Sequence, residues 1–314
     1  MLAEGRVGLV HALDELATVL EDPDARIWVD GEDATEATLV RLGVMLGLHE
    51  LVAKDIIERR QRAKIVAWDE GVHLVVFALA HDGELIVSEV DIVLGRRFLL
   101  TSHPASWQPS EVLREAGLGV SSLLTEGMDM LLYALLDPIV DGYFPVIDRL
   151  SDEIDALESD VMDRSSPEIV ERILRLRRSL LEVRHLVSPE REIFNQLSTR
   201  SLQFIASDRR VYFRDLYDHT IRATDELDTH RELVGGVLDA YLTSVNNNLS
   251  DVMKRLTAIT AVLAGVGAAA GIFGMSEAAS ALGLPAPMGF WLVSAVVAVI
   301  GVLVFAYFRR IDWI

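Results

Sequence analysis

Two long stretches near the C-terminus carry no charged side chain, and they limit the folds open to this chain more than any other feature. They run from Leu256 to Met275 and from Phe290 to Phe308. Each is about the length of a helix that crosses ~30 Å of hydrocarbon. A helix in a soluble core rarely lacks a charged side over this length. The sequence therefore predicts two membrane-spanning helices, at 256–275 and 290–308.

The charges that flank the two stretches predict their orientation. The basic pair Lys254-Arg255 precedes the first stretch and the pair Arg309-Arg310 follows the second, whereas the connecting segment 276–289 has no Lys or Arg. Basic residues are retained on the cytoplasmic side of a membrane. We therefore expect a multi-pass protein of the cytoplasmic (inner) membrane, with segment 276–289 outside and both termini, including the tail 309–314, in the cytosol.

The rest of the chain is charged and acidic, which excludes some classes of function. The formal net charge is −19. This charge disfavours a nucleic-acid partner, which needs a basic surface, and it favours cationic partners. The sequence contains no Walker-type phosphate loop and no ordered Ser-His-Asp set, so we do not expect an enzyme. It also contains no cysteine, which excludes disulfides and thiolate metal sites.

Residues 1–136 have the pattern of a cytosolic α/β domain. Segments rich in Val, Ile and Leu alternate with helical stretches, and the pairs Glu70-Gly71 and Asp82-Gly83 mark turns. A sheet covered by helices, in an α/β/α arrangement, is the expected architecture. The predicted strands are 26–29, 64–68, 73–79, 85–94 and 97–101, and the predicted helices are 35–46 and 50–59.

Residues 137–255 have the pattern of long cytosolic helices. Apolar residues recur at three- and four-residue steps from Tyr143 to Val161 and again from Ile173 to Val187, which predicts an antiparallel helical pair. A third apolar stripe begins near Val211 and continues into the first span. One helix of ~60 residues, ~95 Å long, is expected there. A break at Gly235-Gly236 is the alternative.

The first span is rich in small residues, and the second is bulky. Ala264, Gly267 and Gly271 belong to the small set, which lets helices approach closely in lipid. One interpretation is a tight hairpin within a single chain. The other is that several copies of the first span pack around a central axis while the second span faces lipid.

At this point the sequence resembles the CorA family of divalent-cation channels and transporters, over nearly the whole chain. The segments that carry the resemblance, by their order and spacing, are LVAKDIIERRQRAK (51–64), LYALLDPIVDGYFPVIDRLSDEIDALE (132–158), ILRLRRSLLEVR (173–184), VYFRDLYDHTIRATDELDTHRE (211–232), VMKRLT (252–257), GIFGM (271–275) and RRIDWI (309–314). The resemblance implies an α+β membrane protein that forms a funnel-shaped homopentamer. The first spans would line a pore for divalent cations, with Mg²⁺ as the first candidate and Co²⁺, Ni²⁺ or Zn²⁺ as alternatives.

The chain departs from the family pattern at the outer end of the first span. The family has Gly-Met-Asn there, and this chain has Gly274-Met275-Ser276. Mg²⁺ gives up its water reluctantly, so a ring of amides suits the hydrated ion, and serine would give a wider ring with weaker contacts. Glu277 is either a compensating ring of carboxylates or an ordinary solvated loop acid. Two hypotheses stay open: a channel for different or more numerous cations, and a protein for proton-coupled zinc transport or for sensing without conduction.

By the resemblance, one stripe of residues would face the pore. Met253 and Leu256 are candidates for a hydrophobic gate, with helix packing as the alternative. The stripe consists of Asn246, Ser250, Met253, Leu256, Thr260, Ala264, Gly267, Gly271 and Ser276.

The resemblance also assigns cation sites in the soluble part. Asp82 and Asp215 match positions where acidic groups of neighbouring subunits share a regulatory cation that would hold the ring closed. Asp218 and His219 lie with Asp215 on one helix face, although such a face is usually only solvated. Asp239 lies on the predicted pore side, where it would attract cations.

Overall fold

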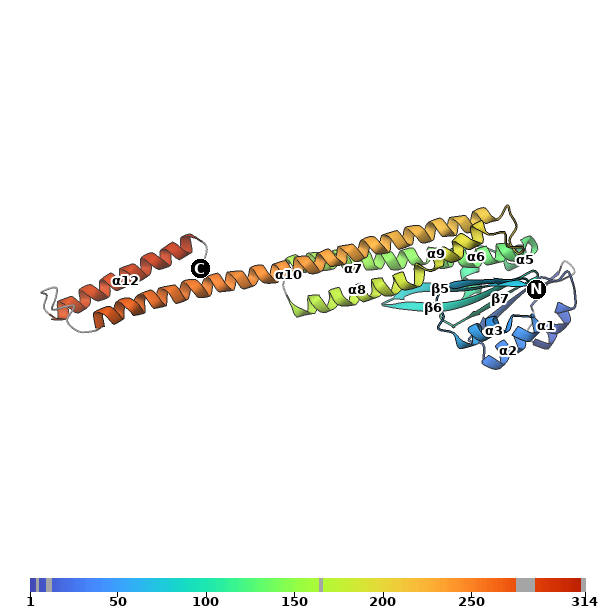
Figure 1. Cartoon of the computed structure of the whole chain (residues 1–314), viewed down its shortest axis with the longest axis horizontal. Helices are drawn as coiled ribbons and strands as arrows, with labels where there is room; N and C mark the ends of the chain where they lie inside the picture. The colour runs from blue at the N-terminus through green and yellow to red at the C-terminus, as the bar shows by residue number, and fades with distance from the viewer. Residues whose placement is uncertain (4–5, 10–12, 164–165, 275–285, 312–314) are drawn as a thin grey trace. The chain divides into compact units, whose positions relative to one another are not determined.

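Figure 1 presents the computed structural model, which describes the whole chain except residues 4–5, 10–12, 164–165, 275–285 and 312–314. The contacts within the chain define two compact units. The first comprises Met1–Asp160 and Pro167–Val237, and the second comprises Val161–Ser166 and Leu238–Ile314.

A five-stranded sheet lies at the centre of the first unit. Its strand order is β3-β7-β6-β5-β4, in which β3 and β7 are parallel and the other neighbours are antiparallel. The hairpin between β5 and β6 turns at Gly83, whose φ of 78° is a conformation that glycine adopts without strain. The strands are β3 (Ile27–Glu32), β4 (Lys64–Trp68), β5 (Gly71–Asp82), β6 (Glu84–Gly95) and β7 (Phe98–His103), and a separate ribbon pairs β1 (Leu2–Ala3) with β2 (Arg6–Val7).

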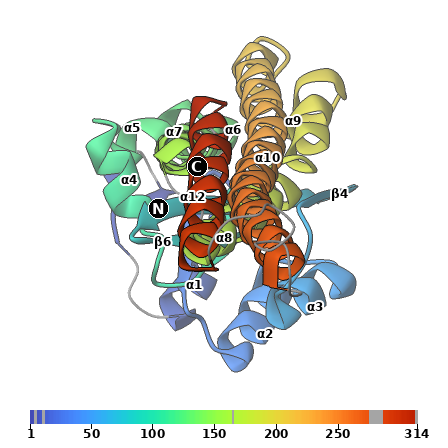
Figure 2. The same ribbon diagram turned by 90° about the vertical axis from the view of Figure 1, so that its left-hand side faces the viewer.

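Helices cover both faces of this sheet, as the sequence predicts (Figures 1 and 2). On one face, Leu42 and Ile56 pack with Ile27, Val93 and Leu100 in a single buried cluster. On the other face, α6 contacts β5, β6 and β7. The first face is covered by α1 (Leu13–Leu20), α2 (Glu36–Met45) and α3 (Glu50–Glu58), and the chain continues after the sheet through α4 (Pro109–Glu115), α5 (Val120–Glu126) and α6 (Met128–Asp141).

The predicted helical pair is present as α7 (Tyr143–Asp163) and α8 (Pro167–Val187), and a shorter helix, α9 (Glu190–Thr199), follows it. The apolar seams that define the pair in the sequence are buried in both helices. This confirms that their three- and four-residue spacing reflects packing against neighbouring elements. The buried seam residues are Tyr143, Ile147, Leu150, Ile154, Leu157 and Val161 in α7, and Ile173, Leu176, Leu180, Val183 and Val187 in α8.

Helix α10 (Arg210–Gly274) is one helix of 65 residues, so the prediction of a long helix is confirmed and Gly235-Gly236 does not interrupt it. Its apolar stripe is buried at residues such as Phe213, Leu227 and Tyr241, whereas Leu249 and Leu256 are exposed. The other helix of the second unit is α12 (Ala286–Arg310). The two helices touch where a Cβ on Gly301 would lie 3.6 Å from Val266 Cγ2.

Two stretches of helix among the described residues have the length and composition of a membrane span. In residues 128–162, 56% of the most apolar window is buried inside the protein, which is the burial of a helix in a soluble core. In residues 210–269 the corresponding share is 6%. The second stretch therefore has an apolar surface that the chain itself leaves uncovered.

Candidate functional site

Three aspartates and a histidine gather between α6 and α10 in the first unit. His219 on α10 lies between two carboxylates, with Nδ1 3.5 Å from Asp141 Oδ1 and Nε2 4.0 Å from Asp215 Oδ1. Asp137 lies one helical turn before Asp141 on α6. The side chains of Asp141 and Asp215 are 59% and 57% exposed, so both remain open to a cation or to another chain.

The electrostatics of this cluster appear in the pKa of Asp137. Burial raises this pKa, and the negative charges of Asp141 and Asp215 raise it further, while a hydrogen bond from Tyr133 and the charge of His219 act in the opposite direction. Tyr133 Oη donates that hydrogen bond to Asp137 Oδ1 at 3.1 Å. Carboxylates that raise the pKa of the neighbouring Asp137 are crowded negative charges, and a divalent cation nearby would relieve their repulsion.

Asp82 lies outside this cluster, at the tip of the β5–β6 hairpin opposite Glu84. Its side chain is exposed, and so are those of Asp218 and Asp239 on α10. Among the residues that the structure describes, no three His, Asp or Glu side chains come close enough together to hold a metal ion. A cation bound by Asp82 or Asp215 would therefore need further ligands from outside this part of the chain.

The predicted pore residues from Asn246 to Gly271 lie on one uncovered side of α10. A Cβ added at Gly267 or Gly271 would meet no atom within 4 Å, so the helix surface is open at these two positions. Gly274 is the last residue of the helix. Met275, Ser276 and Glu277 lie outside the described residues. The stripe members that are exposed in the structure are Asn246, Ser250, Met253, Leu256, Thr260, Ala264, Gly267 and Gly271.

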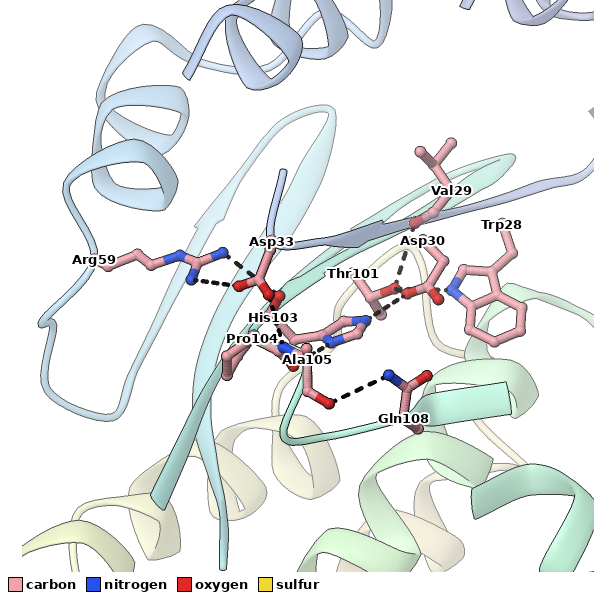
Figure 3. A network of polar contacts seen from close by, with 10 residues as sticks. All are labelled: Trp28, Val29, Asp30, Asp33, Arg59, Thr101, His103, Pro104, Ala105 and Gln108. Atoms are coloured by element: carbon pink, nitrogen blue, oxygen red, sulfur yellow. Dashed lines mark hydrogen bonds and ion pairs between the residues drawn. The ribbon is translucent and has the colours of Figure 1, made fainter. Parts of the chain in front are cut away.

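A second polar network lies at the C-terminal ends of the parallel strands β3 and β7 (Figure 3). His103 Nε2 lies 2.9 Å from Asp30 Oδ1, and its Nδ1 lies 2.9 Å from Pro104 O. Both partners are acceptors, so the protonated ring can donate a hydrogen bond from each nitrogen, and this arrangement favours the imidazolium. Burial lowers the pKa of His103, but the hydrogen bonds to Asp30 and Pro104 together with the negative charges of Asp30 and Glu32 outweigh burial and raise it overall.

Asp33 and Arg59 extend this network from the sheet edge to α3 (Figure 3). Asp33 N donates to His103 O at 2.9 Å, and Asp33 Oδ2 accepts from Ala105 N at 3.2 Å. Arg59 Nη1 lies 3.8 Å from Asp33 Oδ1. The network therefore holds two loops and the end of α3 together, which is a structural role that the sequence analysis did not identify.

Comparison with known proteins assigns the chain to a family. The profile of a family described as "CorA-like Mg2+ transporter protein" matches residues 24–310. The chain belongs to the CorA family. The cobalt/magnesium transport protein CorA of Thermotoga maritima is 34% identical over 280 residues, which are 87% of this chain and 79% of that protein. The protein of the same name from Methanocaldococcus jannaschii is 27% identical over 298 residues, 92% of this chain and 91% of the relative.

Solved CorA structures agree with the fold described above. The complete structure of the CorA magnesium transporter from Methanocaldococcus jannaschii has a TM-score of 0.78 and 25% identity, and the match covers 91% of each chain. The full-length CmaX protein has a TM-score of 0.71 at 21% identity, which supports the fold alone. CorA-family transporters are membrane proteins, and the two long apolar helices α10 and α12 are consistent with that class.

Only part of the acidic cluster of this CorA-family chain is evident from the sequence. Helical spacing places Asp215 and His219 on one helix face, and the structure confirms that placement. Tyr133, Asp137 and Asp141 belong to no predicted site, although they lie at successive four-residue steps and hence on one face of α6. That spacing is the available signal, but the many apolar residues of the segment obscure its polar face.

Proposed function

We propose that this CorA-family protein passes divalent cations across the cytoplasmic membrane as a funnel-shaped ring of five identical chains. The observation that carries the proposal is the apolar surface of α10. Met253, Leu256 and Leu263 are 54%, 58% and 67% exposed in the single chain. Soluble monomers rarely leave such a continuous apolar surface uncovered. Copies of the same helix and a lipid bilayer would cover it.

The membrane topology follows from the charges. We place spans at 256–275 and 290–308, an external loop at 276–289, and both termini in the cytosol. On α12, Trp291 and Tyr307 are 72% and 61% exposed. They lie near the two ends of the helix, where aromatic side chains favour the interface between membrane and water. The first span then lines the pore, and α12 surrounds it.

Mg²⁺ is the first candidate for the transported ion. The relatives named above are cobalt/magnesium transport proteins. The stripe from Asn246 to Gly271 offers hydroxyl, amide and backbone oxygen atoms, with Met253 and Leu256 as an apolar constriction that would stop ions when it is dry. Such a lining suits a cation that keeps most of its water. At the outer mouth, Gly274, Met275, Ser276 and Glu277 would form the ring that receives the ion.

The acidic groups of the first unit would regulate opening. Asp82 and Asp215 are exposed and do not touch each other within one chain, so we place the regulatory cation between neighbouring chains. When the cytosolic cation is plentiful, it neutralises the facing carboxylates and holds the ring closed. When it is scarce, repulsion loosens the ring.

A second candidate rests on Ser276. Its hydroxyl is shorter than the amide of asparagine, so the outer ring would bind hydrated Mg²⁺ less well. The alternative is therefore proton-coupled transport of zinc or another transition metal, or a sensor that binds cations without conducting them.

The test is cation uptake by the purified protein in liposomes, measured separately for Mg²⁺, Co²⁺, Ni²⁺ and Zn²⁺. We expect flux that follows an inside-negative membrane potential and does not respond to a proton gradient. Flux that requires the proton gradient would support the second candidate. If a preparation of proven pentamers passes none of the four ions, the sensor that binds cations without conducting them is the remaining hypothesis. If the protein is a monomer in lipid, the proposed ring of five chains is wrong.

A further inference from the structure

Glu190, the first residue of α9, has a carboxyl group with no exposure to solvent. Its Oε1 accepts a hydrogen bond from Phe77 N at 2.8 Å, and its Oε2 makes a short contact with the hydroxyl of Tyr143 on α7. The same hydroxyl lies 3.2 Å from Phe77 O. Groups from β5, α7 and α9 thus form a closed ring of three polar contacts.

The ring lies at the position where β4 no longer pairs with β5. β4 pairs with β5 only as far as Lys64, which lies opposite Val75. Two residues further along β5, the backbone N–H and C=O of Phe77 meet Glu190 and Tyr143 instead of another strand. A buried backbone group without a partner is costly. The two side chains therefore complete the edge of the sheet at this position.

The number of hydrogen atoms that the three contacts require indicates whether Glu190 is charged or neutral. The Tyr143 hydroxyl has one hydrogen to donate, and it faces two oxygen atoms, Phe77 O and Glu190 Oε2. If Glu190 is ionised, that hydrogen must serve both oxygens. If Glu190 is a neutral acid, its own O–H donates to Tyr143, Tyr143 donates to Phe77 O, and Phe77 N–H donates to Oε1. Only the neutral acid gives every member of the ring a full partner.

We infer that Glu190 is held as a neutral carboxylic acid and that it forms a proton-dependent latch between β5, α7 and α9. Loss of the proton removes one of the three hydrogen bonds and leaves a negative charge in the interior, so the latch opens. β5 ends at Asp82, and the chain after α9 leads into α10 with Asp215. The latch therefore joins β5, which carries the proposed ligand Asp82, to the helix that precedes α10 and its ligand Asp215, but its existence does not depend on cation transport.

The surroundings of Glu190 support the neutral state. The titratable group that faces it is Tyr143 from α7, and β5 presents only the backbone of Phe77. In the described part of the chain, no Lys, Arg or His forms an ion pair with Glu190. Burial is the main influence and raises the pKa of Glu190 to about 8, although the hydrogen bonds from Tyr143 and Phe77 lower it. The resulting stabilisation is complete below the ordinary pKa of 4.5 and is lost as the pH rises towards 8.

The test compares the full-length parent with Glu190→Gln. The glutamine amide donates to Tyr143 as the acid does, and its oxygen still accepts from Phe77 N, so the ring is kept and the titration is removed. We expect the infrared carbonyl band of a neutral carboxylic acid at pH 7 in the parent and its loss in the variant. We also expect the unfolding constant of the parent to rise relative to Glu190→Gln by about tenfold per pH unit between about pH 5 and pH 8.

Glu192→Gln is the matched control, because Glu192 lies on the same helix, is exposed, and accepts a hydrogen bond from Gln196 on that helix. It should keep both the band and the pH dependence of the parent. If Glu190→Gln does not fold, Tyr143→Phe replaces it: removal of the hydroxyl should shift the acid band without abolishing it. Either of two results overturns the inference. The first is that the parent shows no carboxylic-acid band at pH 7 that changes in Glu190→Gln or in Tyr143→Phe. The second is that the parent and Glu190→Gln lose stability in parallel as the pH rises.

Discussion

Asp228 on α10 accepts two hydrogen bonds from the guanidinium of Arg184 on α8, at 2.6 Å from Nε and 3.2 Å from Nη2. The hydrogen bond from Arg184 lowers the pKa of Asp228. The side chains are 33% and 35% exposed, so solvent screens the pair and its contribution is about 0.2–1 kcal/mol. The finding ties the long helix to its neighbour in the first unit.

We expect Asp228→Asn to lower the free energy of unfolding by about 0.2–1 kcal/mol at neutral pH. Because the folded pKa lies below the ordinary value of 3.8, the stabilisation is present above that value and is lost as the pH falls through the folded pKa. Denaturant midpoints of parent and variant should therefore converge in acid. Asp225→Asn, exposed on the same helix, should match the parent throughout; a difference for Asp228→Asn that persists in strong acid contradicts the prediction.

Cation binding at Asp82 and Asp215 predicts stabilisation of the folded protein by Mg²⁺. A ligand at a hundredfold its Kd adds about 2.7 kcal/mol. We expect Mg²⁺ to raise the unfolding temperature of the parent and to do so far less in Asp82→Asn and Asp215→Asn, as measured by thermal unfolding in detergent with and without the ion. Asp152→Asn, exposed on α7, is the control and should keep the full shift. An equal shift in all four proteins would remove both residues from the site.

From the raised pKa of His103 we predict that its contribution to stability falls as the pH rises, which is opposite to the pH dependence expected for Asp228. Its folded pKa is raised by Asp30 and Pro104, with Glu32 as a further negative neighbour, and Arg59 and Asp33 lie nearby in the same network. The stabilisation is complete below the ordinary pKa of 6.5 and is lost as the pH rises through the folded pKa.

The advantage of the parent over His103→Gln should therefore be largest below about pH 6 and shrink above neutrality. Unfolding midpoints across this range measure it, and the titration of the ring carbons by NMR gives the folded pKa directly. His185→Gln, exposed on α8, is the control. A ring that titrates below 6.5 would mean that the imidazolium is not favoured here.

Gly71 is the site of a steric prediction. A Cβ there would lie 2.6 Å and 2.9 Å from two ring atoms of Trp68 and 3.1 Å from Leu94 O. We expect Gly71→Ala to destabilise the fold by about 1–3 kcal/mol, because the ring must move within a packed corner of the sheet. Gly119→Ala is the control, since its Cβ would meet nothing within 4 Å. Equal denaturant midpoints for the two variants would show that Trp68 moves at no cost.

Ser276→Asn tests the outer ring. Asparagine would place amides around the arriving hydrated ion, so we predict a higher Mg²⁺ flux in liposomes than for the parent. Ser280→Asn, later in the same loop, controls for a nonspecific effect of an added amide. If Ser276→Asn conducts no better than the parent, this ring is not the cause of any altered selectivity.

Much of the first unit could be predicted from its sequence. β4 has the predicted bounds, Lys64–Trp68, because its apolar run ends where pairing ends. β3 extends past the predicted end to Glu32, because the parallel ladder with β7 continues over polar residues that apolar content does not reveal. α6 begins at Met128, before the predicted helical region, and it is buried at most of its positions. A helix that is apolar over most of its surface shows only a weak periodicity.

The candidate site divides in a similar way. Helical spacing placed Asp215 and His219 on one face because that arrangement depends only on local geometry. Glu190 could not be found in this way, since an acid after a proline at a helix start is usually solvated. Its burial results from the early end of β4, which leaves Phe77 without a strand partner on that side of β5, although β6 still pairs with it on the other side. Only the folded chain brings residues so distant in sequence together.

The uncovered stripe on α10 sets a rule for insertions and deletions. Each residue turns an α-helix by about 100°, so one residue inserted between Met253 and Thr260 would rotate Gly267 and Gly271 by that angle away from Asn246. Seven inserted residues, close to two full turns, would rotate them by only about 20°. A substitution along this stretch therefore changes one position of the stripe and leaves the others in place. An insertion or deletion keeps the remaining positions on the same side of the helix only when its length is close to a whole number of helical turns.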